Sequence, residues 1–210
     1  MERAYGNMYF DAGNFDVAVF YNKYRDFINE DAVQGSDLNK NFEANNIKHA
    51  TIKGAEVKGR LNLDHFGAPQ GLYTQTSIAY TYGRNDDTGQ PLNSVNPLKG
   101  VFGLGYEQQN YGGLLSWTLV KRKTRVDYST FYSPDGSTSK FRTPGYGVLD
   151  LMAHWNFAPG ATFNVGVFNL ADKRYIEWSS ITPSLITDRA LSDRFSSPGR
   201  TFSASLAVSW

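Results

Sequence analysis

A two-residue period at the end of the chain is the feature that most constrains its fold. In the closing stretch GRTFSASLAVSW, apolar or small residues stand at every second position, and polar or small residues stand between them. Successive side chains of a β-strand point to opposite faces of the sheet, so a period of two indicates a strand. The stretch therefore predicts a strand with one apolar face and one small, polar face.

The same period recurs along the whole chain and predicts an all-β fold. Within residues 147–157, for example, Leu149, Leu151 and Trp155 alternate with Asp150 and His154. Hydrophobic residues make up 40% of the sequence, and no apolar run approaches the ~20 residues of a membrane-spanning helix. The pattern divides the chain into nine strand-like segments, near residues 4–11, 15–29, 47–63, 72–84, 97–108, 113–126, 145–157, 161–170 and 200–210.

The connections between these segments alternate between short and long. Short connections fall near residues 11–14, 64–71, 109–112 and 158–160, and long ones near 30–46, 85–96, 128–144 and 171–199. An antiparallel meander whose two ends face different compartments has this organisation, with tight turns on one side and functional loops on the other. Segment lengths suit strands of ~9–11 residues that cross a bilayer. We predict part of a transmembrane β-barrel in the outer membrane, with the apolar faces against lipid.

The number of segments indicates that residues 1–210 are the C-terminal portion of a larger barrel. Bacterial single-chain barrels have an even number of strands, whereas this chain provides nine. The opening MERAYGNMYF also lacks the apolar region and cleavage site of a signal peptide. A sheet edge left open in hydrocarbon costs several kcal/mol per unpaired backbone group. We therefore expect the segment not to fold stably by itself.

Composition excludes several other classes. The net charge of +1 gives no electrostatic attraction to nucleic acid. Because the sequence contains no cysteine, it has no disulfide framework and no thiolate metal site.

Two stretches near the C-terminus resemble the end of TonB-dependent outer-membrane receptors. VGVFNLADKRYIEWSS carries an Asn-Leu-x-Asp-x-x-Tyr stretch that closes the penultimate strand in that family, and SSPGRTFSASLAVSW carries the Pro-Gly-Arg that opens the last one. The matching residues are Asn169, Leu170, Asp172, Tyr175, Pro198, Gly199 and Arg200. The apolar alternation that ends on an aromatic residue resembles the signal read by the outer-membrane assembly machinery. Its residues are Phe202, Leu206, Val208 and Trp210.

Two further stretches, DTGQPLNSVNPLKGVFGLGY and TPGYGVLDLMAHW, are similar to the haemoglobin and haem branch of this family (transferrin/lactoferrin-type receptors). The resemblance implies a 22-stranded barrel, of which these would be the last nine strands, with the plug domain absent here. It implies haem as the transported ligand, with no cofactor held by this segment. The partners implied are haem or a haem-carrying protein and, through the missing N-terminal part, the TonB energy-coupling complex.

Candidate ligand-binding residues lie toward the ends predicted to face outward. His49 stands near the outer end of its strand, whereas His65 falls in a short turn and His154 near the opposite end. The last long connection carries Arg174, Tyr175 and Trp178, followed by Arg189, Arg194 and Phe195. Aromatic and basic residues together suit recognition of a protein or of a flat anionic ligand. The alternative is that these residues pack the loops and form an aromatic girdle.

We assign neither a catalytic nor a metal-binding residue. Asp150 and His154 share a face, but four residues along a strand span ~13 Å, which is too far for direct proton transfer. Asp86 and Asp87 lack the spacing of a calcium loop and are interpreted as a solvated turn. Glu56, Lys58 and Arg60 alternate on one face, and we expect them to line the wet interior or contact the plug.

The leading interpretation is an outer-membrane active-transport receptor for haem or iron compounds. Two alternatives stay open. One is a siderophore or cobalamin receptor with the same barrel. The other is a β-domain without a transport role, such as a sandwich or adhesin-like domain, that binds a partner through its long loops.

Overall fold

A single sheet contains all nine strands, in the order in which they occur in the chain. The computed structural model describes residues 2–32, 42–128, 141–181 and 194–209. Every neighbouring pair of strands is antiparallel, so the predicted all-β meander is confirmed. The strands are β1 (Glu2–Phe10), β2 (Gly13–Ala32), β3 (Phe42–Asn62), β4 (Leu72–Asn85), β5 (Lys99–Glu107), β6 (Tyr111–Val120), β7 (Tyr146–Ala158), β8 (Ala161–Phe168) and β9 (Thr201–Val208).

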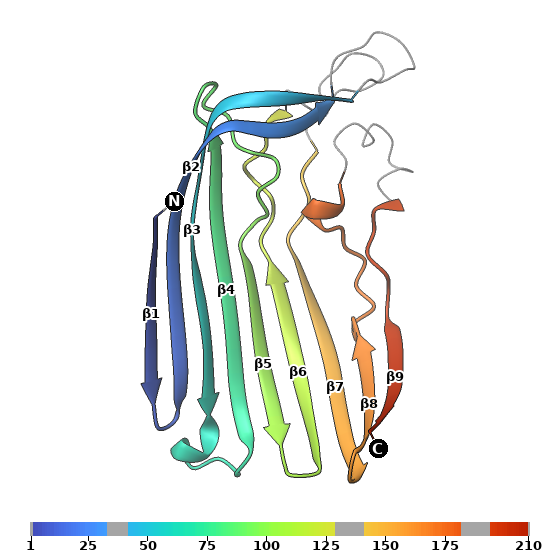
Figure 1. The fold of residues 1–210 in the computed structure, drawn as a ribbon. Coiled ribbons are helices and arrows are strands. Elements are labelled where there is room, and N and C mark those ends of the chain that lie inside the picture. The colour runs from blue at the N-terminus through green and yellow to red at the C-terminus, as the bar shows by residue number, and fades with distance from the viewer. Residues whose placement is uncertain (1, 33–41, 129–140, 182–193, 210) are drawn as a thin grey trace.

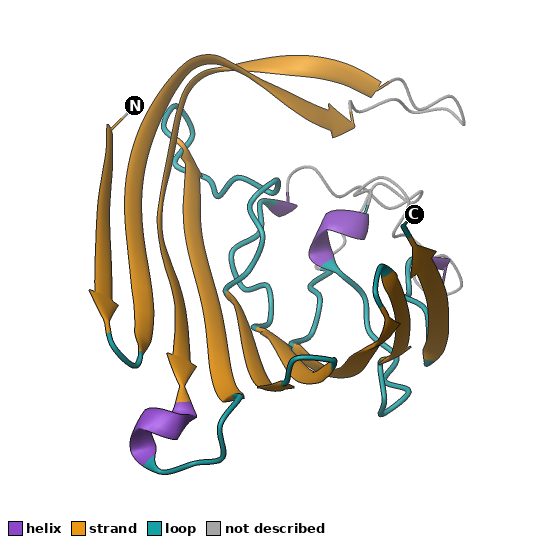
Figure 2. Cartoon of the chain, turned by 60° about the horizontal axis from the view of Figure 1, so that its bottom comes forward, coloured by secondary structure: helices purple, strands orange, loops and turns teal. Residues whose placement is uncertain are grey.

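The sheet curves like the wall of a barrel, with one convex and one concave face (Figure 2). All short connections lie at one end, here called the turn end, and all long connections lie at the other, the loop end (Figure 1). The short 3-10 helix η1 (Leu63–Phe66) lies at the turn end. In the described part of the chain, no helix is long and apolar enough to cross a membrane.

Large apolar side chains cover the convex face and are left exposed. On β7, Leu151 and Trp155 are 43% and 57% exposed, whereas Val148, of the opposite parity, is buried. The cross-strand register carries this parity from strand to strand, for example through Leu151↔Val167 and Val165↔Ala204. Among the described residues no second layer covers this face. An apolar band of this kind is what a lipid-facing barrel wall needs.

The concave face is packed locally by aromatic side chains that lie over glycines. The ring of Tyr73 on β4 lies against Gly105 of β5, so close that a Cβ at Gly105 would stand 2.2 Å from the ring. The guanidinium of Arg60 stacks on the same ring at 3.6 Å from its centroid. Arg60 of β3, one of the charged residues expected to line the interior, is therefore positioned by Tyr73 of β4.

Strand ends differ from the prediction in two places. β2 and β3 continue to Ala32 and from Phe42, well into the segment predicted as a loop. Their hairpin bends over the loop end (Figures 1 and 2) at Asp26, whose φ of 54° interrupts the regular backbone. β6 ends at Val120, not near residue 126, because the chain beyond it leaves the ladder to pack with the other long connections.

Candidate functional site

Three long connections meet at Asn93, at the loop end of the sheet. Its side-chain amide donates to the Asp127 carbonyl at 2.8 Å, and its side-chain oxygen accepts from the Asp127 amide at 2.9 Å. The indole Nε1 of Trp178 donates to the Asn93 carbonyl at 2.6 Å. Asn93, Asp127 and Trp178 lie on different connections, so these bonds tie the three into one unit, here called the loop cluster.

Apolar side chains fill the loop cluster. Trp178 and Val126 are both 7% exposed, and Tyr128, Phe141 and Ile181 pack against them. A second group joins the β4–β5 connection to β3 and consists of Ile47, Ala50, Leu92, Ile52 and Val95. Loops packed in this way form a fixed surface at the loop end.

Lys123 is a buried cation inside the loop cluster. Its Nζ donates to the Val95 carbonyl and lies 4.8 Å from the centroid of the Trp178 ring. Burial, with a smaller contribution from the charge of Arg125, lowers the pKa of Lys123 to about 8. Burial disfavours the charged form of an amine, which explains the direction.

The residues that resemble the family motif build a tight junction between β8 and β9. Asn169 has a left-handed φ of 55°, is 3% exposed, and donates its side-chain amide to the carbonyls of Lys173 (2.9 Å) and Pro198 (3.3 Å). Its backbone amide donates to Asp150 on β7 at 2.8 Å. The Leu170 amide donates to the Leu149 carbonyl at 2.8 Å.

A carboxylate completes this junction. Asp172 accepts from the Arg200 amide at 2.7 Å, and a Cβ on Gly199 would stand 2.6 Å from the same oxygen. The motif thus fixes Arg200, which stands 28 residues after Asp172 and directly before the first residue of β9.

Tyr175 lines a hollow on the concave face. Its ring stacks on that of Tyr146, with centroids 4.4 Å apart and planes 29° apart. The hollow, of about 320 Å³, is also lined by Lys99, Asp150 and Glu177. An aromatic pair flanked by charges of both signs can bind a ligand that has a flat apolar part and polar groups.

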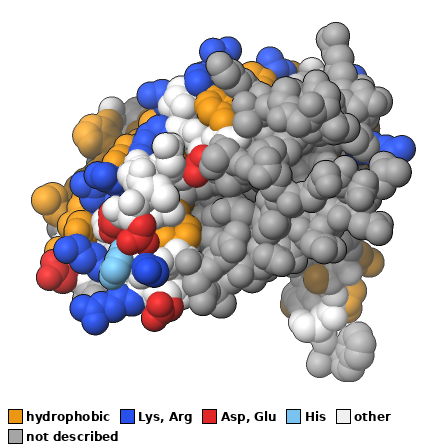
Figure 3. All heavy atoms as spheres, turned by 90° about the horizontal axis from the view of Figure 1, so that it is seen from above, with side chains coloured by type: hydrophobic (Ala, Val, Ile, Leu, Met, Phe, Trp, Pro, Cys, Tyr) orange, Lys and Arg blue, Asp and Glu red, His pale blue; other side chains and the backbone are white. Residues whose placement is uncertain are grey.

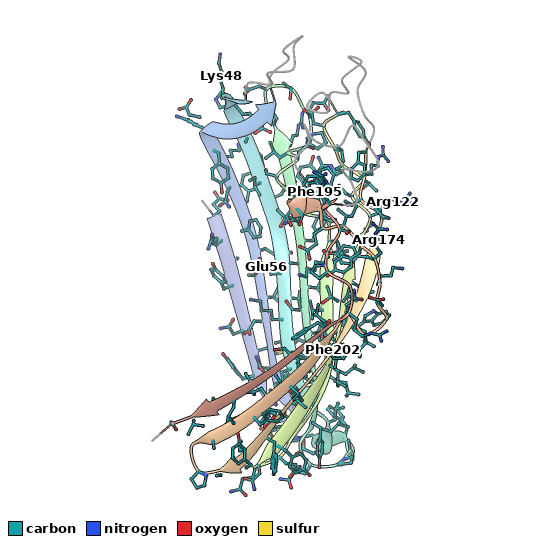
Figure 4. The ribbon with its side chains drawn as sticks, turned by 90° about the vertical axis from the view of Figure 1, so that its right-hand side faces the viewer. Lys48, Glu56, Arg122, Arg174, Phe195 and Phe202 are labelled. Carbon is teal, nitrogen blue, oxygen red and sulfur yellow. The ribbon has the colours of Figure 1, made fainter. Side chains whose placement is uncertain are left out.

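The other candidates of the last connection differ in exposure. Trp178 is buried in the loop cluster, whereas Arg174 is exposed and Phe195 is half-buried. Figure 4 shows Arg122, Arg174 and Phe195 at the loop end, and Phe202 lower, on β9. Arg189 lies outside the described residues.

His49 lies apart from this group. It shares the convex parity of Lys53 and Val57 on β3, and its Nδ1 lies 2.9 Å from Asp87. Asp87 also accepts from the His49 amide at 2.9 Å, and these hydrogen bonds hold the pKa of the Asp87 carboxyl below its usual value.

The sequence predicted that Asp86 and Asp87 form a solvated turn, but the structure gives both of them partners on β3. Asp86 accepts from the Thr51 hydroxyl at 2.6 Å, and Asp87 binds His49. Because both partners lie on β3, the aspartates fasten the β4–β5 connection to its convex side.

Asp150 and His154 do not form a pair. His154 Nε2 lies 3.1 Å from Glu107, and Asp150 accepts from Asn169. His65 lies in η1, near Asp64 at 3.1 Å. Within the described ranges, no group of three or more His, Cys, Asp or Glu side chains is arranged to hold a metal ion.

Phe202, Leu206 and Val208 of the predicted assembly signal lie on the convex face of β9 and are 76%, 61% and 54% exposed. The last residue of that signal, Trp210, is outside the described part of the chain.

Asn93 and Lys123 were not predicted from the sequence. Asn93 lies within DTGQPLNSVNPLKGVFGLGY, in the long connection near residues 85–96. The available signal was the run Pro91-Leu92-Asn93-Ser94, whose Pro, Asn and Ser are typical of a turn. Nothing in the run KRKTR distinguished the buried Lys123 from its exposed neighbours.

The family described as "TonB dependent receptor-like, beta-barrel" matches residues 3–170. Among curated relatives, probable hemoglobin and hemoglobin-haptoglobin-binding protein 4 of Haemophilus influenzae is 31% identical over 228 residues, covering 95% of this chain and 23% of that protein. Hemoglobin-haptoglobin utilization protein B of Neisseria meningitidis serogroup A is 26% identical over 225 residues, covering 91% of this chain and 28% of that protein. The chain thus spans about a quarter of the length of these relatives.

Two solved structures share the fold over nearly the whole chain. The copper transporter OprC superposes with a TM-score of 0.79 at 22% identity, covering 97% of this chain and 30% of that one. The pyoverdine outer membrane receptor FpvA from Pseudomonas aeruginosa PAO1 has a TM-score of 0.66 at 19% identity, covering 99% of this chain and 29% of that one. At such identities the likeness concerns the fold alone. The family match, together with the nine-stranded meander and its exposed apolar face, establishes that this chain belongs to the TonB-dependent receptor β-barrel family.

Proposed function

We propose that this chain is the C-terminal part of an outer-membrane receptor that takes up haem from haemoglobin. The supporting observation is that relatives named for haemoglobin binding or haemoglobin-haptoglobin utilization match 91–95% of the chain. Family members are outer-membrane proteins of Gram-negative bacteria, so the apolar band of the convex face lies in that membrane. The nine strands would be the last nine of a 22-stranded barrel.

The loop end supports recognition of a protein. The bonds at Asn93 hold three connections in fixed positions, so their exposed side chains are presented without a large cost of ordering on binding. Arg174 and the half-buried Phe195 stand at this surface, and Tyr175 lines the hollow beneath it. We assign contact with the partner to Arg174 and Tyr175, and support of the loops to Trp178.

Transport itself needs parts that this segment does not contain. In our proposal, ligand bound at the loops passes through the barrel when the plug is remodelled with energy from the TonB complex. The outer-membrane assembly machinery would recognise the alternating apolar residues of β9. Because the family consists of transporters, we assign the chain no enzymatic role.

The deciding experiment is growth with haemoglobin as the sole iron source, comparing cells with and without the intact gene. We expect loss of growth on haemoglobin and unchanged growth on an inorganic iron salt. If growth on haemoglobin persists while uptake of a ferric siderophore, of cobalamin or of copper fails, the cargo proposed here is wrong.

A second experiment tests the loop residues. The complete receptor with Arg174→Ala is expected to bind haemoglobin at the cell surface more weakly, with an unchanged amount of receptor. Lys173→Ala, an exposed neighbouring cation, is the matched control. Equal binding by wild type and Arg174→Ala would remove Arg174 from the proposed surface.

A further inference from the structure

The convex face changes from apolar to basic at one level across three neighbouring strands. Val17 on β2 pairs with Val57 on β3, which pairs with Ile78 on β4, and all three have the lipid-facing parity. Higher on the same face, the register aligns Tyr21, Lys53 and Tyr82 in one row, and Lys23, Thr51 and Arg84 in the next row of this parity. The apolar band therefore ends in tyrosines and cations at the height where a membrane surface begins.

Cations on this face are held against tyrosine rings. Lys53 Nζ lies 5.2 Å from the centroid of the Tyr82 ring, and the Arg125 guanidinium lies 3.7 Å from the same centroid. Lys23 Nζ lies 5.9 Å from the centroid of Tyr21. Two like charges drawn to one ring repel each other, and an anion between them would remove that repulsion.

Among the described residues, no carboxylate forms an ion pair with Lys23, Lys53, Arg84 or Arg125. The neighbouring Asp86 and Asp87 accept hydrogen bonds from Thr51 and His49. Seen from above, Lys and Arg side chains stand among apolar, acidic and histidine side chains on the part of the loop end that is not grey (Figure 3).

We propose that Lys23, Lys53, Arg84 and Arg125, here called the basic rim, bind the phosphate of a lipid headgroup in the outer leaflet. The acyl chains of such a lipid lie beside Val17, Val57 and Ile78, and its phosphate reaches the cations above them. Arginine and lysine are the side chains that proteins use for phosphate, as a fork and as a point charge respectively. The rim lies on the convex face, away from the concave hollow, so this inference is independent of the transported cargo.

The test measures phosphorylated lipid bound to the purified complete receptor. We expect the triple variant Lys23→Gln/Lys53→Gln/Arg125→Gln to retain about tenfold less lipopolysaccharide than wild type. This reduction corresponds to the loss of about one charge-assisted hydrogen bond. Arg60→Gln is the matched control, because Arg60 also stacks on a tyrosine, but on the concave face. Lys53→Arg, which keeps the charge, is expected to retain the lipid.

Three probes separate the sources of phosphate: lipopolysaccharide, dephosphorylated lipopolysaccharide and inorganic phosphate. The proposal requires that only the first binds tightly. It is overturned if the triple variant retains as much lipopolysaccharide as wild type, or if Arg60→Gln loses as much lipopolysaccharide as the triple variant. It is also overturned if dephosphorylated lipopolysaccharide or inorganic phosphate alone binds as tightly as lipopolysaccharide. Heat-dependent gel mobility reports folding of each variant. If the triple variant does not assemble, Lys53→Gln alone decides by the same criteria.

Discussion

Asn93 and Asp127 exchange two hydrogen bonds across 34 residues of sequence, at 2.8 and 2.9 Å. Asn93 also accepts from Trp178, which lies 85 residues further along the chain. A single asparagine therefore connects three of the long connections, and the shape of the loop end depends on it.

Asn93→Ala should loosen the loop cluster while leaving the strands intact. The change leaves the amide and the carbonyl of Asp127 without their partner, a loss of about 1–3 kcal/mol in the free energy of local opening. Native-state proteolysis of the complete receptor measures this opening, because cleavage follows the population of the open form. We expect roughly tenfold faster cleavage in the loops per 1.4 kcal/mol lost.

Asn96→Ala is the matched control, since Asn96 is an exposed asparagine in the same connection. Cleavage as slow in Asn93→Ala as in Asn96→Ala would mean that the exchanged bonds do not hold the loops together.

The stability of the loop cluster should depend on pH through the titration of Lys123. Its pKa falls from 10.5 in the open chain to about 8 when buried, so between these values the open form binds more protons. The cost of burying the charge is fully present below pH 8 and is relieved as the pH rises through 8 toward 10.5. Stability of the cluster should therefore increase over that range.

Quenching of Trp178 fluorescence by acrylamide measures the effect, taken as the difference between wild type and Trp178→Phe. Protection of Trp178 should rise between pH 8 and 10.5 in wild type and stay flat in Lys123→Met, which has no titrating group. A fall in protection over this range in wild type would contradict the assignment.

The strands could be predicted from the sequence because lipid and water impose opposite requirements on their two faces. On β7 every outward position from Leu149 to Phe157 is apolar or alanine, so the period of two survives without interruption. The order of the strands followed from the alternation of short and long connections. Where no such constraint acts, as in residues 121–126, the pattern still resembled a strand although the chain had left the sheet.

The loop cluster could not be predicted in the same way. Contacts such as Trp178 with Asn93 join residues far apart in sequence, and no local period encodes which loops meet. Lys123 stands in a basic run, and lysines are mostly exposed in proteins, yet its ammonium lies against Trp178 and Val95. The motif around Asn169 was noticed only as a resemblance, and its left-handed φ explains why an asparagine suits that position.

Gly199→Ala should weaken the junction where β9 begins. The added methyl would stand 2.6 Å from the Asp172 oxygen that accepts from Arg200, so the carboxylate must move off that amide. We expect a loss of about 1–2 kcal/mol in the free energy of unfolding. A double-mutant cycle with Asp172→Ala measures it, since both changes remove the same bond and their effects should not add. Gly6→Ala is the control, because a Cβ at Gly6 would meet no atom within 4 Å. Additive effects in the cycle would contradict a clash between the added methyl and Asp172.

Gly105→Ala should displace the Tyr73 ring from the concave face. A Cβ at Gly105 would lie 2.2 Å from that ring. The guanidinium of Arg60 also stacks on the ring, 3.6 Å from its centroid. Overpacking of this kind costs about 1–3 kcal/mol, which would appear as a lower unfolding midpoint of the receptor in detergent. In a Tyr73→Ala background the same glycine change should cost little, because the ring it collides with is gone. An equal cost in both backgrounds would show that the close approach of β4 and β5 does not depend on the ring lying over the glycine.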